Sequence, residues 1–268
     1  MIWSIGIMTQ RYFLYHAGCE DGFASALVPW QIFGSTAKYL PVSHGEPPPS
    51  LPRDASVVIT DFSYRREILL ELANSVEHIV LLDHHQTAQK DLEDLEFAHF
   101  DMEKSGATLS WEYWHPNETT PDIFRYVEDR DLWKFNLEKS AEVNAAIASY
   151  AFDFKIWNQF DIPELAIEGV HILRSIRQQV TRIADRAMLQ VIGGYEVPVV
   201  NTSTYASDIL DELGRRFPDA PFAACFYDTS RGEKRWSLAS SGNFDVGNLA
   251  SELGGGGHYH RSGFLERY

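Results

Sequence analysis

Cysteine and basic residues are scarce in this sequence of 268 residues. Its two cysteines, Cys19 and Cys225, form no CxxC pair and are too few to imply a disulfide framework. The 23 Lys and Arg are outnumbered by 38 Asp and Glu, and the net charge of −15 disfavours a duplex DNA binder, which needs a basic face. No apolar run approaches about 18 residues, and the apolar opening Met1–Met8 lacks the basic lead of a signal peptide. We therefore expect a cytoplasmic protein without a membrane partner.

The negative charge is concentrated in the first half of the chain. Residues 1–154 carry a net charge of −13, residues 155–191 carry +1, and residues 192–268 carry −3. Solvated acidic surface accounts for much of such a bias. However, carboxylates that hold divalent cations also count as negative here, because formal charge omits the metal. The distribution therefore directs attention to the acidic residues of the first half.

Short apolar runs alternate with amphipathic stretches over the first 100 residues, a pattern typical of a parallel α/β sheet. The predicted strands of this half are Arg11–Tyr15, Ser56–Thr60 and His78–Leu82. The predicted helices are Gly22–Phe33, Arg65–Val76, Ser105–Trp114, Pro121–Trp133 and Glu142–Tyr150, and Gly45–Pro52 is predicted to be a loop.

A single apolar stripe predicts one long helix over Pro163–Leu189, which we expect to connect two domains. The second half then reads as strand, helix, strand, strand and helix, over Glu196–Val200, Ala206–Phe217, Phe222–Tyr227, Arg235–Ser240 and Val246–Leu253. The predicted fold class is α/β, with a parallel-sheet domain (1–154), a connecting helix (155–191) and a smaller α/β domain (192–268).

Side chains able to bind metal follow each predicted strand of the first half. His16 follows the first strand, Asp61 the second, and the triplet Asp83–His85 the third. The carboxyl ends of parallel strands face one crevice, so these side chains should converge. The loop after the first strand adds Cys19, Glu20 and Asp21, and a later acidic pair is formed by Asp129 and Asp131.

This mixture of carboxylates and imidazoles favours Mn²⁺, Mg²⁺ or Fe²⁺ over structural zinc. Because carboxylates can bridge, such a site can hold two cations. Any one of these residues could instead be an ordinary structural histidine or a helix cap. Their joint placement at successive strand ends is what favours a metal site.

Two separated motifs resemble those of one enzyme family. Asp83–His85 resembles the signature of the DHH phosphoesterases, His16–Ser25 resembles their first motif, and Val57–Asp61 resembles their second. Near the other end of the chain, Leu253–Phe264 resembles the glycine-rich motif of the associated DHHA1 domain. The family contains RecJ-type exonucleases, nano-RNases that degrade short oligoribonucleotides, and phosphodiesterases of cyclic or linear dinucleotides.

The resemblance implies a role for each matching residue. Asp61 would bridge two Mn²⁺ ions, and Asp131 is preferred over Asp129 because it precedes Phe135 by four residues. His84, His85 and Asp83 would be catalytic residues, with Asp83 and His85 orienting the neighbouring ligands. The implied metal ligands are His16, Asp21, Asp61, His84 and either Asp131 or Asp129.

Two positions depart from the family pattern. Cys19 stands where the commoner first motif has an additional Asp, which leaves open whether Cys19 or Glu20 replaces it. Ala239 stands where many DHHA1 domains carry an Arg, and Arg235 or Arg261 could substitute for it.

The run of four glycines before His258 has its own physical interpretation. Backbone N–H groups without neighbouring Cβ atoms can form a nest for a phosphate, although a flexible turn after a helix is the simpler alternative. The start of the helix at Ser105 could also bind a phosphate or be an ordinary cap. The predicted substrate-binding residues are Gly255, Gly256, Gly257, His258, Arg261 and Ser105.

Together these features predict a Mn²⁺-dependent phosphodiesterase that hydrolyses linear dinucleotides such as pGpG, or short oligoribonucleotides, to mononucleotides. A processive nuclease would need a basic track, and this sequence offers only scattered Arg. The alternatives are a cyclic-dinucleotide phosphodiesterase, a pyrophosphatase, or a nucleotide-binding module with impaired catalysis. The sequence leaves the oligomeric state open, and a homodimer is one alternative to a monomer.

Overall fold

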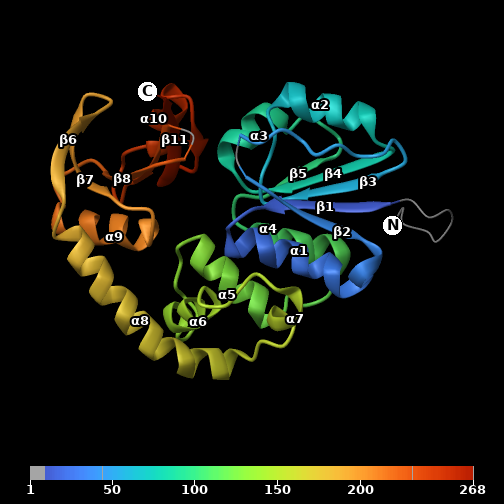
Figure 1. Ribbon diagram of the computed structural model, residues 1–268, viewed down its shortest axis with the longest axis horizontal. Coiled ribbons are helices and arrows are strands. Elements are labelled where there is room, and N and C mark those ends of the chain that lie inside the picture. The colour runs from blue at the N-terminus through green and yellow to red at the C-terminus, as the bar shows by residue number, and fades with distance from the viewer. Residues whose placement is uncertain (1–9, 44, 231, 268) are drawn as a thin grey trace. The chain divides into compact units, whose positions relative to one another are not determined.

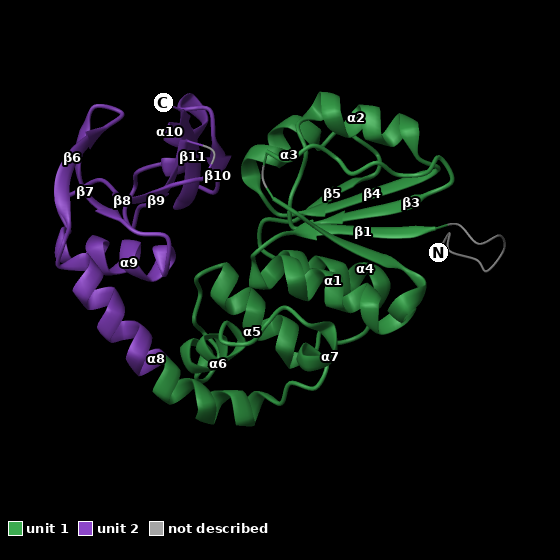
Figure 2. Ribbon diagram, viewed as in Figure 1, with its two compact units in different colours: residues 1–172 green, residues 173–268 purple. Residues whose placement is uncertain are grey.

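The computed structural model describes residues 10–43, 45–230 and 232–267, so the apolar opening Met1–Met8 lies outside the described residues. The chain divides into two compact units, residues 1–172 and 173–268 (Figure 2). No helix among the described residues is long and apolar enough to cross a membrane.

Unit 1 is an α/β unit. Its strands are β1 (Arg11–His16), β2 (Lys38–Val42), β3 (Ser56–Thr60), β4 (His78–Asp83) and β5 (Ala98–Phe100). Its helices are α1 (Glu20–Phe33), the 3₁₀ turn η1 (Gly34–Thr36), α2 (Arg66–Ser75), α3 (Gln86–Leu92), α4 (Gly106–Trp114), α5 (Asp122–Asp131), α6 (Ser140–Ile147) and α7 (Phe154–Trp157). The helix α8 (Ile162–Ala184) contains the division between the two units.

The strands of unit 1 form a parallel sheet in the order β2-β1-β3-β4-β5, which confirms the predicted fold class. Helices α1 and α4 cover one face of this sheet and α2 and α3 cover the other (Figure 1). Because β1 pairs with both β2 and β3, the direction of winding reverses between β1 and β3. In open α/β sheets, ligands bind beyond the carboxyl ends of strands at such a switch point.

The predicted strands and helices of unit 1 are present, with ends that differ by a few residues, and Gly45–Pro52 is neither helix nor strand. Strands β2 and β5 were not predicted. Strand β2 contains Pro41, which cannot donate to a ladder and is tolerated because β2 lies at the sheet edge. Strand β5 has only three residues and so gives no alternating pattern.

Unit 2 contains a mixed sheet in the order β10-β11-β9-β8-β7-β6, with only β7 and β8 parallel to each other. Helices α9 and α10 pack against separate apolar clusters of this unit. Its elements are β6 (Met188–Ile192), β7 (Tyr195–Asn201), α9 (Ala206–Arg216), β8 (Ala223–Asp228), β9 (Glu233–Ala239), α10 (Val246–Glu252), β10 (Gly256–Gly257) and β11 (Arg261–Arg267).

The predicted helix Pro163–Leu189 was too long at its carboxyl end. Helix α8 stops at Ala184, and Met188–Ile192 forms strand β6. The cause is the turn at Gly193 and Gly194, whose φ angles of 57° and 87° allow a two-residue hairpin that pairs β6 with β7.

Candidate metal centre

The end of β1 and the loop that follows it carry two side chains with metal-binding atoms, His16 and Cys19. His16 is the last residue of β1, and α1 begins directly after Cys19. The loop is held by a 2.9 Å hydrogen bond from the N–H of Ala17 to a carbonyl of β2. The first turn of α1 approaches the loop so closely that a Cβ at Gly22 would lie 2.3 Å from the carbonyl oxygen of His16. Backbone packing therefore fixes where His16 lies.

Asp61 follows β3 and is buried. Its φ of 61° lies in the left-handed region, which Asp tolerates better than most residues, and its N–H donates to the carbonyl of Leu82 at 3.0 Å. Its Oδ1 lies 3.1 Å from Nε2 of His84, and its Oδ2 lies 3.4 Å from Nδ1 of His16. No described residue donates a hydrogen bond of ordinary geometry to this buried Oδ2. Asp61 therefore presents one carboxylate oxygen to each of two groups of side chains.

The carboxylate of Asp21 is bound by the first turn of α4. It accepts hydrogen bonds from the N–H of Gly106 at 2.6 Å and from the N–H of Ala107 at 3.0 Å. Ser105 caps this helix through its side chain, and its own N–H donates to Glu128 at 3.1 Å. The N–H groups that the sequence offered to a phosphate are therefore occupied by two carboxylates of unit 1, and Ser105 is a buried helix cap.

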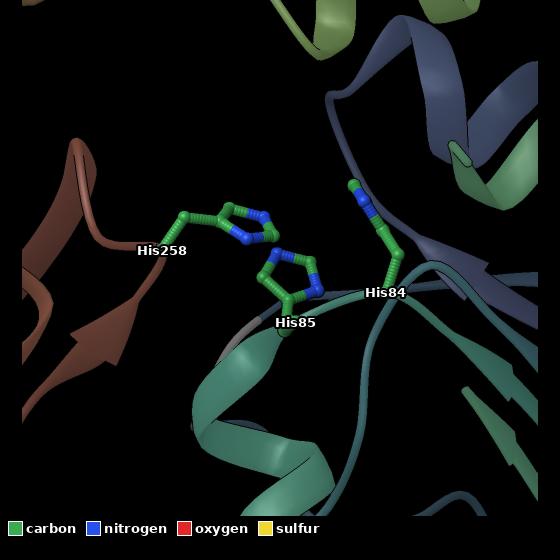
Figure 3. Close-up of side chains that lie close together, drawn as sticks. All are labelled: His84, His85 and His258. Carbon is green, nitrogen blue, oxygen red and sulfur yellow. The ribbon is translucent and has the colours of Figure 1, made fainter. Parts of the chain in front are cut away.

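His84 lies among three carboxylates at the end of β4. Its Nε2 is 3.1 Å from Oδ1 of Asp61, 3.5 Å from Oδ2 of Asp131 and 3.9 Å from Oδ2 of Asp21. Figure 3 shows His84 and His85 leaving the chain at this strand end, and their ring centroids are 4.8 Å apart. The structure therefore brings four predicted ligands together: His84, Asp61, Asp131 and Asp21.

Asp83 holds the two histidines that follow it. Its Oδ1 lies 2.7 Å from Nδ1 of His85 and accepts hydrogen bonds from the N–H groups of His84, at 2.8 Å, and His85, at 3.3 Å. Its Oδ2 accepts a short hydrogen bond from the hydroxyl of Ser63. Because both of its oxygens accept protein hydrogen bonds, the buried Asp83 is placed to position the histidines.

The two acidic residues at the end of α5 have different surroundings. Oδ1 of Asp129 accepts a hydrogen bond from the N–H of Asn136 at 2.8 Å, and its Oδ2 accepts one from the N–H of Leu137 at 3.1 Å. Asp129 is buried and holds the turn after α5. Of the two, it is Asp131 that lies next to His84.

The carboxylates of this group repel one another. Burial, followed by the charges of Asp61 and Asp131, raises the pKa of Asp21 well above its ordinary value. Burial also raises the pKa of Asp131, although His84 opposes it. For Asp61 burial acts in the same direction, but the imidazoles of His16 and His84 prevail and hold its pKa well below the usual range. Burial acts against the charged form of His84, but the neighbouring carboxylates raise its pKa to about 10. This group of side chains thus favours a positive charge, which a bound cation would supply in place of the proton.

Two overlapping groups of side chains could each hold a cation. In each group the ligand atoms lie within 4.8 Å of one another: Asp21, Asp61 and His84 form one, and His16, Cys19 and Asp61 form the other. Carboxylate and imidazole ligands fit divalent cations such as Mn²⁺, Mg²⁺ and Fe²⁺, and the buried Oδ2 of Asp61 is aimed into the second group. The residues present therefore fit a centre with two cations that share Asp61.

The glycine-rich segment of unit 2 is built into a hairpin. Gly256–Gly257 forms β10, which pairs with β11, and a Cβ at Gly255 would lie 2.0 Å from a carbonyl oxygen of β11. The N–H of Gly255 donates to a carbonyl of α10 at 2.8 Å, and the N–H of His258 donates to the carbonyl of Arg261 at 2.6 Å. Close backbone packing thus explains Gly255 and Gly257. Two of the N–H groups expected to form a phosphate nest, those of Gly254 and Gly255, donate to carbonyls of α10.

Two residues that support the metal centre were not singled out from the sequence. Gly106 allows α4 to reach the ligands, since a Cβ there would lie 2.6 Å from Cβ of Asp61 and 2.9 Å from Oδ2 of Asp21. Its position directly after Ser105 was a signal that could have singled it out. Ser63, which contacts Asp83, carried no signal of its own.

Known proteins resemble this chain in fold more than in sequence. No known protein-family model matches it. It is 30% identical to an uncharacterized protein of Acanthamoeba polyphaga mimivirus, in a match that covers 93% of this chain and 66% of that protein. The chain therefore spans slightly less than two thirds of the length of this viral relative.

Two solved structures are similar over 96% of this chain. RecJ of Thermus thermophilus in complex with Mn²⁺ is 14% identical, with a TM-score of 0.55, and 50% of its length is covered. A pGpG-specific phosphodiesterase of Vibrio cholerae is 12% identical, with a TM-score of 0.49, and 93% of its length is covered. At this identity the likeness to RecJ shows the fold, and it agrees with the DHH and DHHA1 motifs of the sequence.

Proposed function

We propose that this chain, which has the fold of a RecJ-like DHH phosphoesterase, is a metal-dependent phosphodiesterase that hydrolyses short nucleotide substrates. The observation that carries the proposal is the placement of Asp61. Its two carboxylate oxygens face His84 and His16 separately, and the buried Oδ2 has no hydrogen-bond donor of ordinary geometry among the described residues. A carboxylate so placed suits a bridge between two cations.

The protein contributes the ligands and their rigidity. Asp21, Asp131 and His84 would complete the position at Oδ1 of Asp61, and His16 would belong to the position at Oδ2. Bound divalent cations, proposed to be Mn²⁺, would supply Lewis-acid stabilisation of phosphoryl charge and a water of lowered pKa. The N–H groups of α4 hold the carboxylate of Asp21 in one orientation, which fixes where its oxygens can bind.

His85 is proposed to act on the substrate directly. Its Nδ1 faces Asp83 at 2.7 Å, so a proton on Nδ1 holds the ring in one orientation. Nε2, on the opposite side of the ring, is then the nitrogen proposed to contact the substrate. Burial alone would lower the pKa of His85, but the negative charge of Asp83 raises it above the ordinary value. A protonated His85 could stabilise phosphoryl charge or protonate the leaving oxygen.

Unit 2 is proposed to bind the distal nucleotide through its glycine-rich segment, Gly255–Gly257, and through two neighbouring side chains. Arg261 supplies a cationic group and His258 an imidazole nitrogen, both suited to a phosphate. Since the N–H groups of Gly255 and His258 donate to backbone carbonyls, the phosphate contacts would rely on side chains more than on a backbone nest.

The charge of the chain supports a short substrate. A long single strand requires a basic groove, yet the net charge is −15. The four arginines of the connecting segment, Arg174, Arg177, Arg182 and Arg186, are exposed residues on and just after α8, as expected for a solvated helix face. We therefore propose a linear dinucleotide such as pGpG as the substrate.

The decisive experiment is Mn²⁺-dependent turnover of pGpG, pApA, a longer RNA, a cyclic dinucleotide and pyrophosphate by the purified chain. Rapid conversion of pGpG to GMP, with slow cleavage of the longer RNA, would support the proposal. Faster turnover of the cyclic dinucleotide or of pyrophosphate would show that this compound, and not pGpG, is the substrate. Dinucleotide binding without turnover at any Mn²⁺ concentration would favour an impaired module. Asp61→Asn is the matched inactive control, since Asn also tolerates a positive φ.

A further inference from the structure

We infer that Cys19 is a metal ligand, and that the position formed by His16, Cys19 and Asp61 takes a thiolate-preferring divalent cation such as Zn²⁺, Co²⁺ or Fe²⁺. The neighbouring position, built from carboxylates and His84, has no thiol and would keep the preference for Mn²⁺ or Mg²⁺. The centre would then hold two different metals. This inference rests on the proposed metal centre and is independent of the substrate.

The geometry brings the three donors of this position together. Nδ1 or Nε2 of His16, Sγ of Cys19 and a carboxylate oxygen of Asp61 all lie within 4.8 Å of one another. Three different segments supply them: the end of β1, the residue before α1, and the residue after β3. The close approach at Gly22 and the hydrogen bond of Ala17 fix the loop that carries the first two.

An unsatisfied atom points into the same position. Oδ2 of Asp61 is buried and accepts no hydrogen bond of ordinary geometry from a described residue, while Oδ1 faces His84. A buried carboxylate oxygen without a donor costs about 1–3 kcal/mol or more, so its retention needs an explanation. A cation bound between Oδ2, His16 and Cys19 supplies one.

Ordinary structural roles do not account for Cys19. It occupies the N-cap of α1, but its side chain makes no cap hydrogen bond, and Ser, Thr, Asp or Asn would serve better there. A free cysteine in a protein interior usually behaves as a small apolar residue. The thiol of Cys19 instead lies within 4.8 Å of metal-binding atoms of His16 and Asp61.

Cys225 shows what a structural cysteine looks like in this protein. It is 1% exposed and lies in an apolar cluster of unit 2 with Val200, Ile209 and Ala223. It therefore provides a second thiol that should not bind metal.

A thiolate ligand changes which metal is selected. Soft sulfur ligands favour Zn²⁺, Fe²⁺ and Co²⁺ over Mg²⁺ and Mn²⁺, whereas carboxylates favour the latter. Coordination replaces the thiol proton of Cys19, which leaves to solvent, so no oxidant or reductant is required. Replacing the thiol by a carboxylate should reverse the preference.

The test is a titration of the purified, metal-free full chain with Co²⁺, followed by absorption spectroscopy. We expect a thiolate-to-Co²⁺ charge-transfer band in the near ultraviolet, present in the wild type and in Cys225→Ala and absent in Cys19→Ser. Elemental analysis should find two metal ions per chain in the wild type. In Cys19→Asp it should still find two ions, with the relative affinity for Mn²⁺ over Zn²⁺ raised at least tenfold.

Two outcomes would overturn the inference: binding of two Co²⁺ ions by the wild type without this band, or a band that persists in Cys19→Ser. A measurement on the wild type avoids any folding defect of the variants. Zn²⁺ should protect Cys19 from alkylation at least tenfold, as measured by peptide mass spectrometry, and unchanged alkylation in a protein shown to bind two Zn²⁺ ions would also overturn the inference. The result separates from the proposed function, because the band requires no substrate and pGpG hydrolysis requires no thiolate ligand.

Discussion

The carboxylate of Asp21 accepts a 2.6 Å hydrogen bond from the N–H of Gly106, a residue 85 positions further along the chain. The contact places a proposed metal ligand at the amino end of α4, where the partial positive charge of the helix favours an anion. It is close enough that the absence of a side chain at Gly106 is a requirement, since a Cβ there would overlap Asp61 as well as Asp21. The amino end of α4 is thus part of the metal centre without offering a ligand.

Substitution Gly106→Ala should weaken metal binding. The added Cβ would lie 2.6 Å from Cβ of Asp61, so α4 or the strand end must move. We expect the affinity for Mn²⁺ to fall about 10- to 100-fold, as is usual when the support of a ligand is lost. We also expect the free energy of unfolding to fall by about 1–3 kcal/mol. Isothermal titration calorimetry and urea unfolding measure the two effects.

Gly242→Ala is the matched control for this substitution. Gly242 is exposed, has an ordinary φ, and a Cβ there would contact nothing within 4 Å. Gly242→Ala should leave the affinity for Mn²⁺ and the free energy of unfolding unchanged. Equal Mn²⁺ affinity in the two variants would show that the close approach of α4 does not support the ligands.

The two acidic residues of α5 should respond differently to neutralisation. Asp131→Asn should lower the affinity for Mn²⁺ strongly while leaving the metal-free protein as stable as the wild type or more stable. The reason is that burial of Asp131 and its repulsion from Asp61 and Asp21 outweigh its attraction to His84, so that the pKa of Asp131 is raised. Asp129→Asn should instead cost about 1–3 kcal/mol of unfolding free energy, because it weakens the hydrogen bonds to the turn after α5.

Calorimetry with Mn²⁺ and thermal unfolding of the metal-free protein distinguish the two variants. If Asp129→Asn abolishes metal binding while Asp131→Asn preserves it, the assignment of these two residues must be exchanged.

The sequence predicted which side chains follow the strands, because apolar runs end visibly at His16, Asp61 and Asp83. It did not predict which groups touch, since spacing along the chain says nothing about distances across it. The choice between Asp129 and Asp131 depends on the turn after α5, whose N–H groups hold only Asp129.

The unpredicted strands have local causes. Strand β2 carries a proline, and the predicted helix extended into the first two residues of β6, Met188 and Leu189. Met188–Ile192 forms a strand and not the end of a helix because the hairpin turn pairs it with β7, an interaction outside the segment itself. In the glycine-rich segment the composition suggested anion binding, which stays a prediction, and it gave no sign that Gly255 and Gly257 also pack closely against β11.

Stability at high pH should depend on Cys225. Burial raises the pKa of this thiol from 9.0 to about 12, so the folded chain holds the proton more tightly than the unfolded chain does. The contribution of the Cys225 thiol to the free energy of unfolding is therefore fully present below pH 9 and is lost as the pH rises toward 12. The difference in unfolding free energy between wild type and Cys225→Ala should therefore shrink above pH 9, by at most about 1.4 kcal/mol per pH unit.

Urea unfolding of both proteins at pH 8 and pH 10 measures this difference. The comparison cancels other groups that titrate in the same range, such as Tyr64. An identical difference at the two pH values would show that the thiol is ionised as easily in the folded chain as in the unfolded one.

Asp83 should affect turnover without affecting metal content. Its carboxylate holds Nδ1 of His85 at 2.7 Å and accepts a hydrogen bond from Ser63. It meets the proposed ligand His84 through the backbone N–H at 2.8 Å, a hydrogen bond that Asn can also accept. Asp83→Asn removes the charge that orients and protonates His85, so we expect kcat for pGpG to fall about 100-fold or more. KM and the number of bound Mn²⁺ ions should change little.

Ser63→Ala removes one hydrogen bond to Asp83 and should reduce kcat less, because the charge of Asp83 remains. Steady-state kinetics with elemental analysis of each variant test this order, and an Asp83→Asn protein with full kcat and full metal content would remove His85 from the proposed proton transfer.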